Sequence, residues 1–150
     1  MKIEGVHPLS APRDRVFDAL IDPAVLQKCI PGCEHLEKTA ENQYKAALAV
    51  GVGPIKGKFS ANVTLHNLHR HERYSLSVDG TGQPGFVKGS GQLEFREEGQ
   101  GTTVAYSGDV NVGGLLASVG QRMIQASANM MIGRFFSALE NETSASRQAS

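Results

Sequence analysis

The feature that most constrains the fold is a period-two alternation of apolar residues, which recurs in five segments between residues 44 and 112. Clusters of glycine, proline and polar residues separate these segments. Alternation broken by regularly spaced turns is typical of antiparallel strands that bury one face. The alternating positions are Tyr44, Ala46, Leu48, Val50 and Val52; Phe59, Ala61, Val63 and Leu65; Tyr74, Leu76 and Val78; Val87, Gly89, Gly91, Leu93 and Phe95; and Val104, Tyr106, Gly108, Val110 and Val112. A sheet of this kind must cover its apolar face with another element.

The chain before these segments predicts one further strand and two short helices. Residues 2–9 form the predicted strand, which Pro12 ends. Residues 10–14 then have the composition of a helix start, with serine, proline and an acid in order. Asp22-Pro23 starts a second short helix, and Pro31-Gly32 ends it.

One long helix over residues 115–142 is predicted to cover the sheet. Its apolar arc, centred on Gly120, Ile124, Met131 and Ala138, spans about 200°, whereas a surface helix needs about 100°. A curved sheet must therefore wrap around this helix. We expect an α+β fold in one domain over residues 1–140, with about seven antiparallel strands around the C-terminal helix and two short helices after strand 1. Residues 141–150 are expected to form a disordered tail.

Composition narrows the partners and the compartment. Fifteen basic residues balance fifteen acidic ones, which argues against nucleic acid as a main partner. No apolar run approaches the ~20 residues of a membrane span, and the N-terminus lacks a signal-peptide core. We therefore expect a cytoplasmic protein, with both cysteines reduced.

Small residues on the facing surfaces predict a ligand pocket between helix and sheet, although a close-packed core without a cavity is the alternative. The predicted pocket residues are Phe59, Phe95 and Tyr106 from strands, and Gly120, Ile124, Ala128, Met131, Arg134 and Phe135 from the helix. Arg134 lies at the edge of the apolar arc and could hold a polar head group of the ligand. Its position favours two other roles for Arg134. The side chain either snorkels, with its charged end reaching solvent, or takes part in a structural ion pair.

No metal site is predicted. Cys29 and Cys33 lack the second pair that a zinc site needs, so buried thiols are favoured over a redox switch. His66, His69 and His71 have the arginine neighbours Arg70 and Arg73, which favours a solvated turn over a metal site.

No catalytic residues are predicted either. Residues 80–85 spell G-x-G-x-x-G, but Pro84 stands where the helix of a dinucleotide site should begin. No serine elbow or His-Glu-x-x-His motif is present. His7 and Tyr106 are the candidate titratable groups for an enzyme that used the same cavity.

Four motifs resemble the CoxG family, which is named for a carbon monoxide dehydrogenase subunit and belongs to the START-like helix-grip (SRPBCC) superfamily. They are Cys29-Ile30-Pro31-Gly32-Cys33-Glu34; the glycine-rich segment 50–57; the segment 112–120 before the last helix; and Phe135-Phe136. The resemblance covers residues 3–139. Many members of the family continue into a tail with an apolar end thought to meet the membrane. This sequence ends at Ser150, so an anchor of that kind is not predicted here.

The resemblance implies a helix-grip fold with a hydrophobic cavity, and an accessory role for a molybdo-flavo-iron-sulfur hydroxylase of the carbon monoxide dehydrogenase type. The expected ligand is a quinone or a lipid, with no tightly bound cofactor. The expected place is the inner face of the membrane, with peripheral membrane contact. The alternative is a polyketide cyclase-like or other small-molecule enzyme that uses the same cavity.

Overall fold

The computed structural model describes residues 1–53 and 55–149, with side chains throughout these ranges except for Val52 and 145–149. The strands are β1 (Lys2–Leu9), β2 (Cys33–Ala40), β3 (Gln43–Val52), β4 (Ile55–His69), β5 (Arg73–Gly82), β6 (Gly85–Glu98) and β7 (Gly101–Gly113). The helices are α1 (Arg13–Ala19), α2 (Pro23–Cys29), the 3-10 helix η1 (Gly114–Val119) and α3 (Gln121–Ala149).

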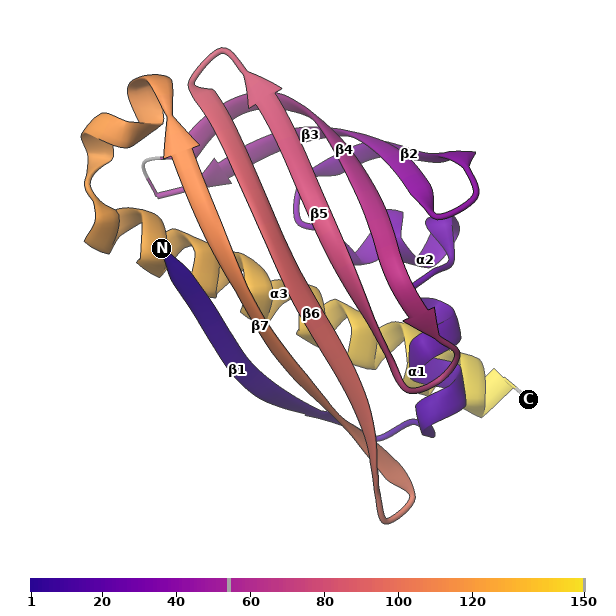
Figure 1. The fold of residues 1–150 in the computed structure, drawn as a ribbon. Coiled ribbons are helices and arrows are strands. Elements are labelled where there is room, and N and C mark those ends of the chain that lie inside the picture. Colours follow the sequence, from indigo (N-terminus) through magenta and orange to yellow (C-terminus); the bar gives the residue numbers. More distant parts are fainter. Residues whose placement is uncertain (54, 150) are drawn as a thin grey trace.

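All the strands form one antiparallel sheet in the order β1-β7-β6-β5-β4-β3-β2. The sheet curves around α3, which crosses beneath it from the η1 end to the α1 end (Figure 1). Helices α1 and α2 contact α3 near its C-terminal end. The predicted α+β architecture, a curved antiparallel sheet around a long helix with two short helices after strand 1, is therefore confirmed.

The apolar set of each strand faces α3. Cross-strand pairing aligns the inner positions in rows, such as Tyr44, Val63, Val78, Gly89 and Val110. Residues from these sets, including Leu65 and Val104, share a buried core with Phe136 and Leu139 of α3. The alternation therefore predicted which face of each strand is inside.

The alternation did not locate β2. Its residues are mostly exposed, and Leu36 is the one fully buried position among them. Register shifts interrupt its pairing with β3 near both ends. An edge strand with a single buried residue carries no period-two signal.

The start of the long helix differs from the prediction. Gly120 does not lie on a buried helix face but separates η1 from α3, with a φ of +99° and no atom within 4 Å of where a Cβ would be. A left-handed φ is available to glycine at little cost, and it turns the chain between the two helices. A side chain at residue 120 would therefore strain the backbone and would not crowd any neighbouring atom. This corrects the prediction that Gly120 lies on the buried face of the helix.

The end of α3 also differs from the prediction. The helix continues through residues 141–144, and Thr143 is buried with its hydroxyl donating to the Leu139 carbonyl at 2.8 Å. The expected tail therefore does not begin at residue 141. The rest of the predicted tail, 145–150, lies outside the residues described in full.

Candidate functional site

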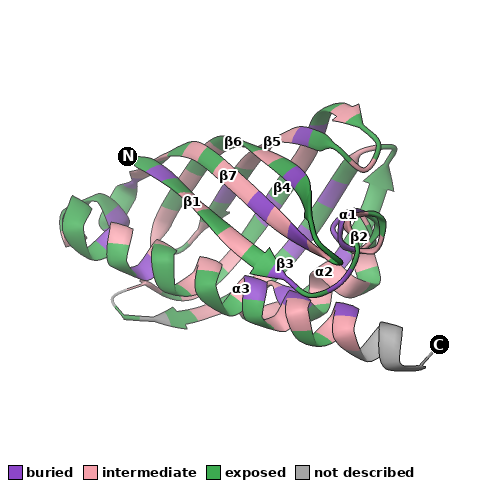
Figure 2. Ribbon diagram, turned by 90° about the horizontal axis from the view of Figure 1, so that it is seen from below, coloured by how far each residue is buried: buried purple, intermediate pink, exposed green. Residues whose placement is uncertain are grey.

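Two halves of the inner face differ in burial. At the α1 end, rings of Phe17, Tyr74 and Phe95 pack edge-on or tilted with centroids 5.1–5.8 Å apart. The hydroxyls of Tyr44 and Tyr74 donate to backbone carbonyls, at 2.7 Å and 3.4 Å. Burial raises the pKa of both tyrosines above the ordinary value. This half is a filled core (Figure 2).

At the η1 end, most inward apolar side chains of the sheet are only half-buried and lie outside the core cluster, although Ala61 of β4 and Ile124 of α3 are buried. We call this set the inner apolar surface: Val50, Ile55, Phe59, Val78, Val87, Val110 and Val112 of the sheet, with Ala128 and Met131 of α3. Helix α3 approaches the sheet here through the buried Ile124 and Ser127, but the half-buried residues around them show that it leaves part of the apolar inner face uncovered. Such a surface suits an apolar ligand.

Two glycines leave the inner face of the sheet without side chains beside this surface. Gly91 and Gly108 face each other across β6 and β7. A Cβ at Gly91 would lie 2.9 Å from the Ser107 carbonyl oxygen, and one at Gly108 would lie 2.6 Å from that of Ser90. Only glycine fits such a close approach of two strands. At these two positions of β6 and β7, the inner face of the sheet therefore has no side chain that could fill the space toward α3.

The predicted pocket residues divide into three groups. Phe59, Ala128 and Met131 belong to the inner apolar surface, while Tyr106 and Phe135 lie half-buried where it meets the core. Ile124 is buried on α3, and Phe95 is buried in the aromatic core because α1 brings Phe17 against it. Gly120 and Arg134 are exposed. The structure therefore brings five of the nine predicted residues to one region.

Tyr106 is the tyrosine whose hydroxyl is not used by the fold. In the described part of the chain its ring stacks on Phe136 at 5.5 Å, and no hydrogen bond to its Oη is found. Gly5 stands directly opposite Tyr106, and a Cβ there would lie 2.6 Å from Oη. Gly5 thus makes room for this hydroxyl, which can donate to a ligand. Arg134 is exposed, as expected for the snorkelled alternative.

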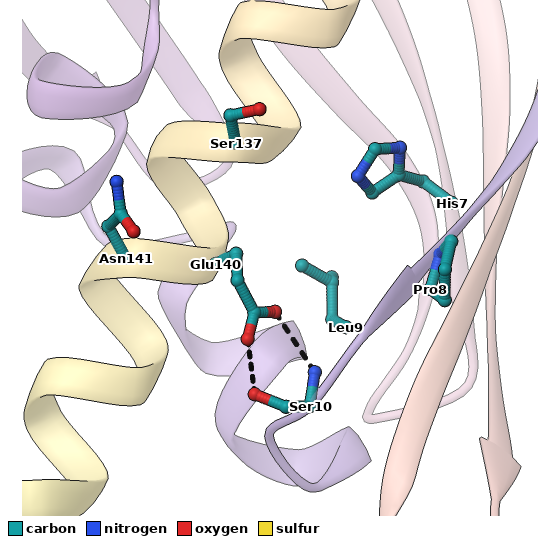
Figure 3. Close-up of a pocket in the computed structure, with 7 residues that line it drawn as sticks. All are labelled: His7, Pro8, Leu9, Ser10, Ser137, Glu140 and Asn141. Carbon is teal, nitrogen blue, oxygen red and sulfur yellow. Dashed lines mark hydrogen bonds between the residues drawn. The ribbon is translucent and has the colours of Figure 1, made fainter.

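One pocket of the structure, which the sequence did not predict, lies between β1 and α3. It has a volume of about 580 Å³ and is lined by His7, Pro8, Leu9, Ser10, Ser137, Glu140 and Asn141 (Figure 3). The backbone N–H and the hydroxyl of Ser10 both donate to the Glu140 carboxylate. The His7 ring stacks on Phe136 at 4.7 Å. More than a hundred residues separate the two walls, so no local pattern could have revealed it.

The histidine cluster is dispersed among different partners. His66 Nε2 lies 3.2 Å from the Ser77 hydroxyl, whereas His71 lies 3.6 Å from Asp14 and 3.1 Å from Asp18 of α1. Among the described residues, no group of three or more His, Cys, Asp or Glu is arranged to hold a metal ion. The absence of a tightly bound metal stays a prediction.

The two cysteines are free thiols in the structure. Burial, helped by the charge of Glu142, raises the pKa of Cys29 to about 11. Burial also raises the pKa of Cys33, whose thiol donates to the His35 carbonyl at 3.4 Å. Thiols with raised pKa values are poor nucleophiles near neutral pH. This environment favours two structural thiols over a redox switch.

None of the helices in the described residues is both long enough and apolar enough to cross a bilayer.

No curated protein matches this chain in sequence. Among solved structures, a conserved protein from Geobacillus kaustophilus is 34% identical with a TM-score of 0.94, over 97% of both chains.

More distant structures share the fold. A START superfamily protein from Mycobacterium smegmatis is 12% identical with a TM-score of 0.76, over 96% of this chain and 97% of that one. The Zhui aromatase/cyclase from Streptomyces sp. R1128 is 16% identical with a TM-score of 0.70, over 96% and 93%. The family model of the carbon monoxide dehydrogenase subunit CoxG matches residues 5–144. The chain therefore belongs to the CoxG family and has the START-like helix-grip fold.

Proposed function

We propose that this protein binds an apolar small molecule, an isoprenoid quinone or a lipid, on the inner apolar surface. In this role it serves a molybdenum hydroxylase of the carbon monoxide dehydrogenase type at the cytoplasmic face of the membrane. The observation that carries the proposal is the set of inward apolar residues that the core leaves half-buried at the η1 end. Membership of the CoxG family supports the choice of partner.

The chemistry of the surface fits a mostly apolar ligand. Binding would come from burial of apolar area, at about 25 cal/mol per Å² before the cost of association. Met131 on α3 is unbranched and can adapt to an irregular shape. The Tyr106 hydroxyl, at the border with the core, would donate to a carbonyl at the polar end of the ligand. The exposed Arg134 is not needed for this role.

The alternative function, a cyclase-like enzyme, has less support in the geometry. Its two candidate titratable groups are His7 and Tyr106. His7 lines the pocket between β1 and α3 rather than the inner apolar surface. Both rings stack on Phe136, but only Tyr106 borders the inner apolar surface, so this surface itself carries one of the two titratable groups. Binding without chemistry is therefore favoured.

Substituting Ala128 by phenylalanine tests the proposal. The larger ring would fill the inner apolar surface, and we expect binding of a short-chain quinone to weaken roughly tenfold or more. Isothermal titration calorimetry measures this affinity, with native mass spectrometry of the purified protein to detect a co-purifying lipid or quinone. Ala126→Phe is the control, because Ala126 is exposed on the same helix. Equal binding by both variants, or no binding by the parent protein, would contradict the proposal.

Membrane contact is proposed to use the η1 end, the end of the sheet at which the inner apolar surface lies. Leu115 of η1 and Met123 in the first turn of α3 are 72% and 50% exposed, and Phe86 is 39% exposed. Phe86 is held outward because its ring packs over Gly113. Residues 80–93 and 110–139 contain no Asp or Glu, but they include Lys88 and Arg122. Apolar side chains in acid-free, basic surroundings suit an anionic bilayer surface.

Vesicle co-sedimentation tests this contact. We expect the parent protein to bind vesicles containing phosphatidylglycerol more strongly than vesicles of pure phosphatidylcholine. Leu115→Ser should weaken that binding roughly tenfold, because one buried leucine is lost. Met130→Ser is the control. Met130 is as exposed as Met123, but it lies about two helical turns further from η1 along α3. A parent protein that stays in the supernatant, or equal losses in the two variants, would contradict a membrane contact through η1.

A further inference from the structure

The two edges of the sheet are finished in different ways. At the β2 edge, the Gln27 side chain bonds the middle of the strand, donating to the Glu34 carbonyl at 3.2 Å and accepting from the Leu36 N–H at 3.3 Å. Register shifts near both ends of β2 add to this protection. Covering and bulging are the usual means by which an edge strand avoids pairing with another chain.

The hydrogen bonds at the start of β1 define which of its backbone groups point outward. Met1 donates to and accepts from Val110 of β7. Antiparallel pairing alternates, so every second residue after Met1 faces β7 in the same way. The backbone N–H and C=O groups of the residues between them point to the open edge. These outward residues are Lys2, Glu4, Val6 and Pro8.

Two contacts with α3 agree with this alternation. Gln125 Nε2 donates to the outward Lys2 carbonyl at 3.0 Å. The outward N–H of Ser10 donates to Glu140 at 3.0 Å. The helix therefore covers both ends of the β1 edge and leaves the stretch from Glu4 to Pro8 between them.

That central stretch is open. In the part of the chain that the structure describes, no hydrogen bond reaches the outward N–H and C=O of Glu4 or Val6, nor the Pro8 carbonyl. The Val6 side chain is 64% exposed. The α3 residues between the two covering contacts include Gly133, where a Cβ would meet no atom within 4 Å. There is thus room for a strand beside β1.

We infer that this edge pairs with the β1 edge of a second copy of the chain, antiparallel across a two-fold axis at Val6. Each Val6 would donate to and accept from Val6 of the second copy. Each Glu4 N–H would donate to the Pro8 carbonyl of the second copy. Because proline has no N–H, four main-chain hydrogen bonds form in all.

Side chains and charge favour this partner and this register. An axis at Val6 places the two exposed valines opposite each other, whereas an axis at Glu4 would place two carboxylates together. The formal net charge of the chain is zero at pH 7, so two copies do not repel each other. The pairing closes on itself and leaves no β1 edge open. It does not depend on the proposed ligand.

The test uses two variants with opposite expected effects. Val6→Pro removes only an outward N–H, so β1 keeps its bonds to β7 while the dimer loses its two central bonds and weakens roughly tenfold or more. Pro8→Val supplies a new outward N–H in each copy and should tighten the dimer. Val6→Thr keeps the N–H and is the control. Sedimentation equilibrium of the full chain measures dissociation, and circular dichroism checks that each variant is folded.

Amide hydrogen exchange supplies a second measurement, which locates the contact. The Glu4 and Val6 amides of the parent protein should become protected as its concentration rises, while the Val6→Pro variant should show no such protection at Glu4. A parent protein that stays monomeric at millimolar concentration would overturn the inference. So would a dimer that Val6→Pro leaves as tight as before.

Discussion

Phe17→Ala is expected to lower the free energy of unfolding by about 3–5 kcal/mol, the usual cost of deleting a buried aromatic ring. Phe17 is 1% exposed, and its ring contacts those of Tyr74, Phe95 and His71 at centroid distances of 5.8, 5.1 and 5.4 Å. It is the side chain by which α1 fills the core under the sheet. Urea unfolding followed by circular dichroism measures the change.

Phe86→Ala is the matched control. Phe86 is 39% exposed at the opposite end of the sheet, and the Lys88 ammonium nitrogen lies 5.8 Å from the centroid of its ring. We expect its loss to cost less than about 1 kcal/mol. If the two variants unfolded at the same urea concentration, the aromatic cluster around Phe17 would not be the centre of the core.

The strand pattern was predictable because the sheet buries one face continuously. Inner positions recur at every second residue in β5 and in β4 up to Leu65, so Leu65 and Tyr74 could be placed inside without a structure. Strand β2 could not be found, because Leu36 alone is buried there and tertiary pairing with β3 makes it a strand. Local sequence carries no trace of a partner that lies elsewhere in the chain.

The helix boundary shows a second limit. Residues 115–119 continue the apolar pattern of α3, but the positive φ of Gly120 separates them as η1. A periodicity argument counts glycine as a small residue on a helix face. At this position, however, the ability of glycine to adopt a positive φ determines where η1 ends and α3 begins.

The placement of several predicted residues on one side of α3 could be anticipated, because helical spacing is reliable once a helix is known. Ala128, Met131 and Phe135 do lie on one side of α3, toward the sheet. Phe95 was misplaced, since the residue that buries it, Phe17, comes from α1. The spare hydroxyl of Tyr106 became evident only when the partners of Tyr44 and Tyr74 were known.

Gly32→Ala should lower the free energy of unfolding by about 2–4 kcal/mol, through backbone strain and a steric clash together. Gly32 has a φ of +75°, and an added Cβ would collide with the Ala49 carbonyl oxygen. The Gly32 carbonyl accepts from the Ala49 N–H at 2.8 Å, so the turn cannot move away without losing this bond. The turn joins α2 to β2 and thereby holds the edge of the sheet.

Gly51→Ala is the control for this second stability prediction. Gly51 lies in the neighbouring strand β3, has no positive φ and would place its Cβ where no atom lies within 4 Å. Alanine there should leave stability unchanged or raise it by about 0.4–1 kcal/mol, because the unfolded chain loses freedom. Urea unfolding of both variants separates a general effect of losing glycine from the specific demand of the turn. A Gly32→Ala protein as stable as the Gly51→Ala protein would mean that the turn after α2 can adopt another backbone path without moving β2.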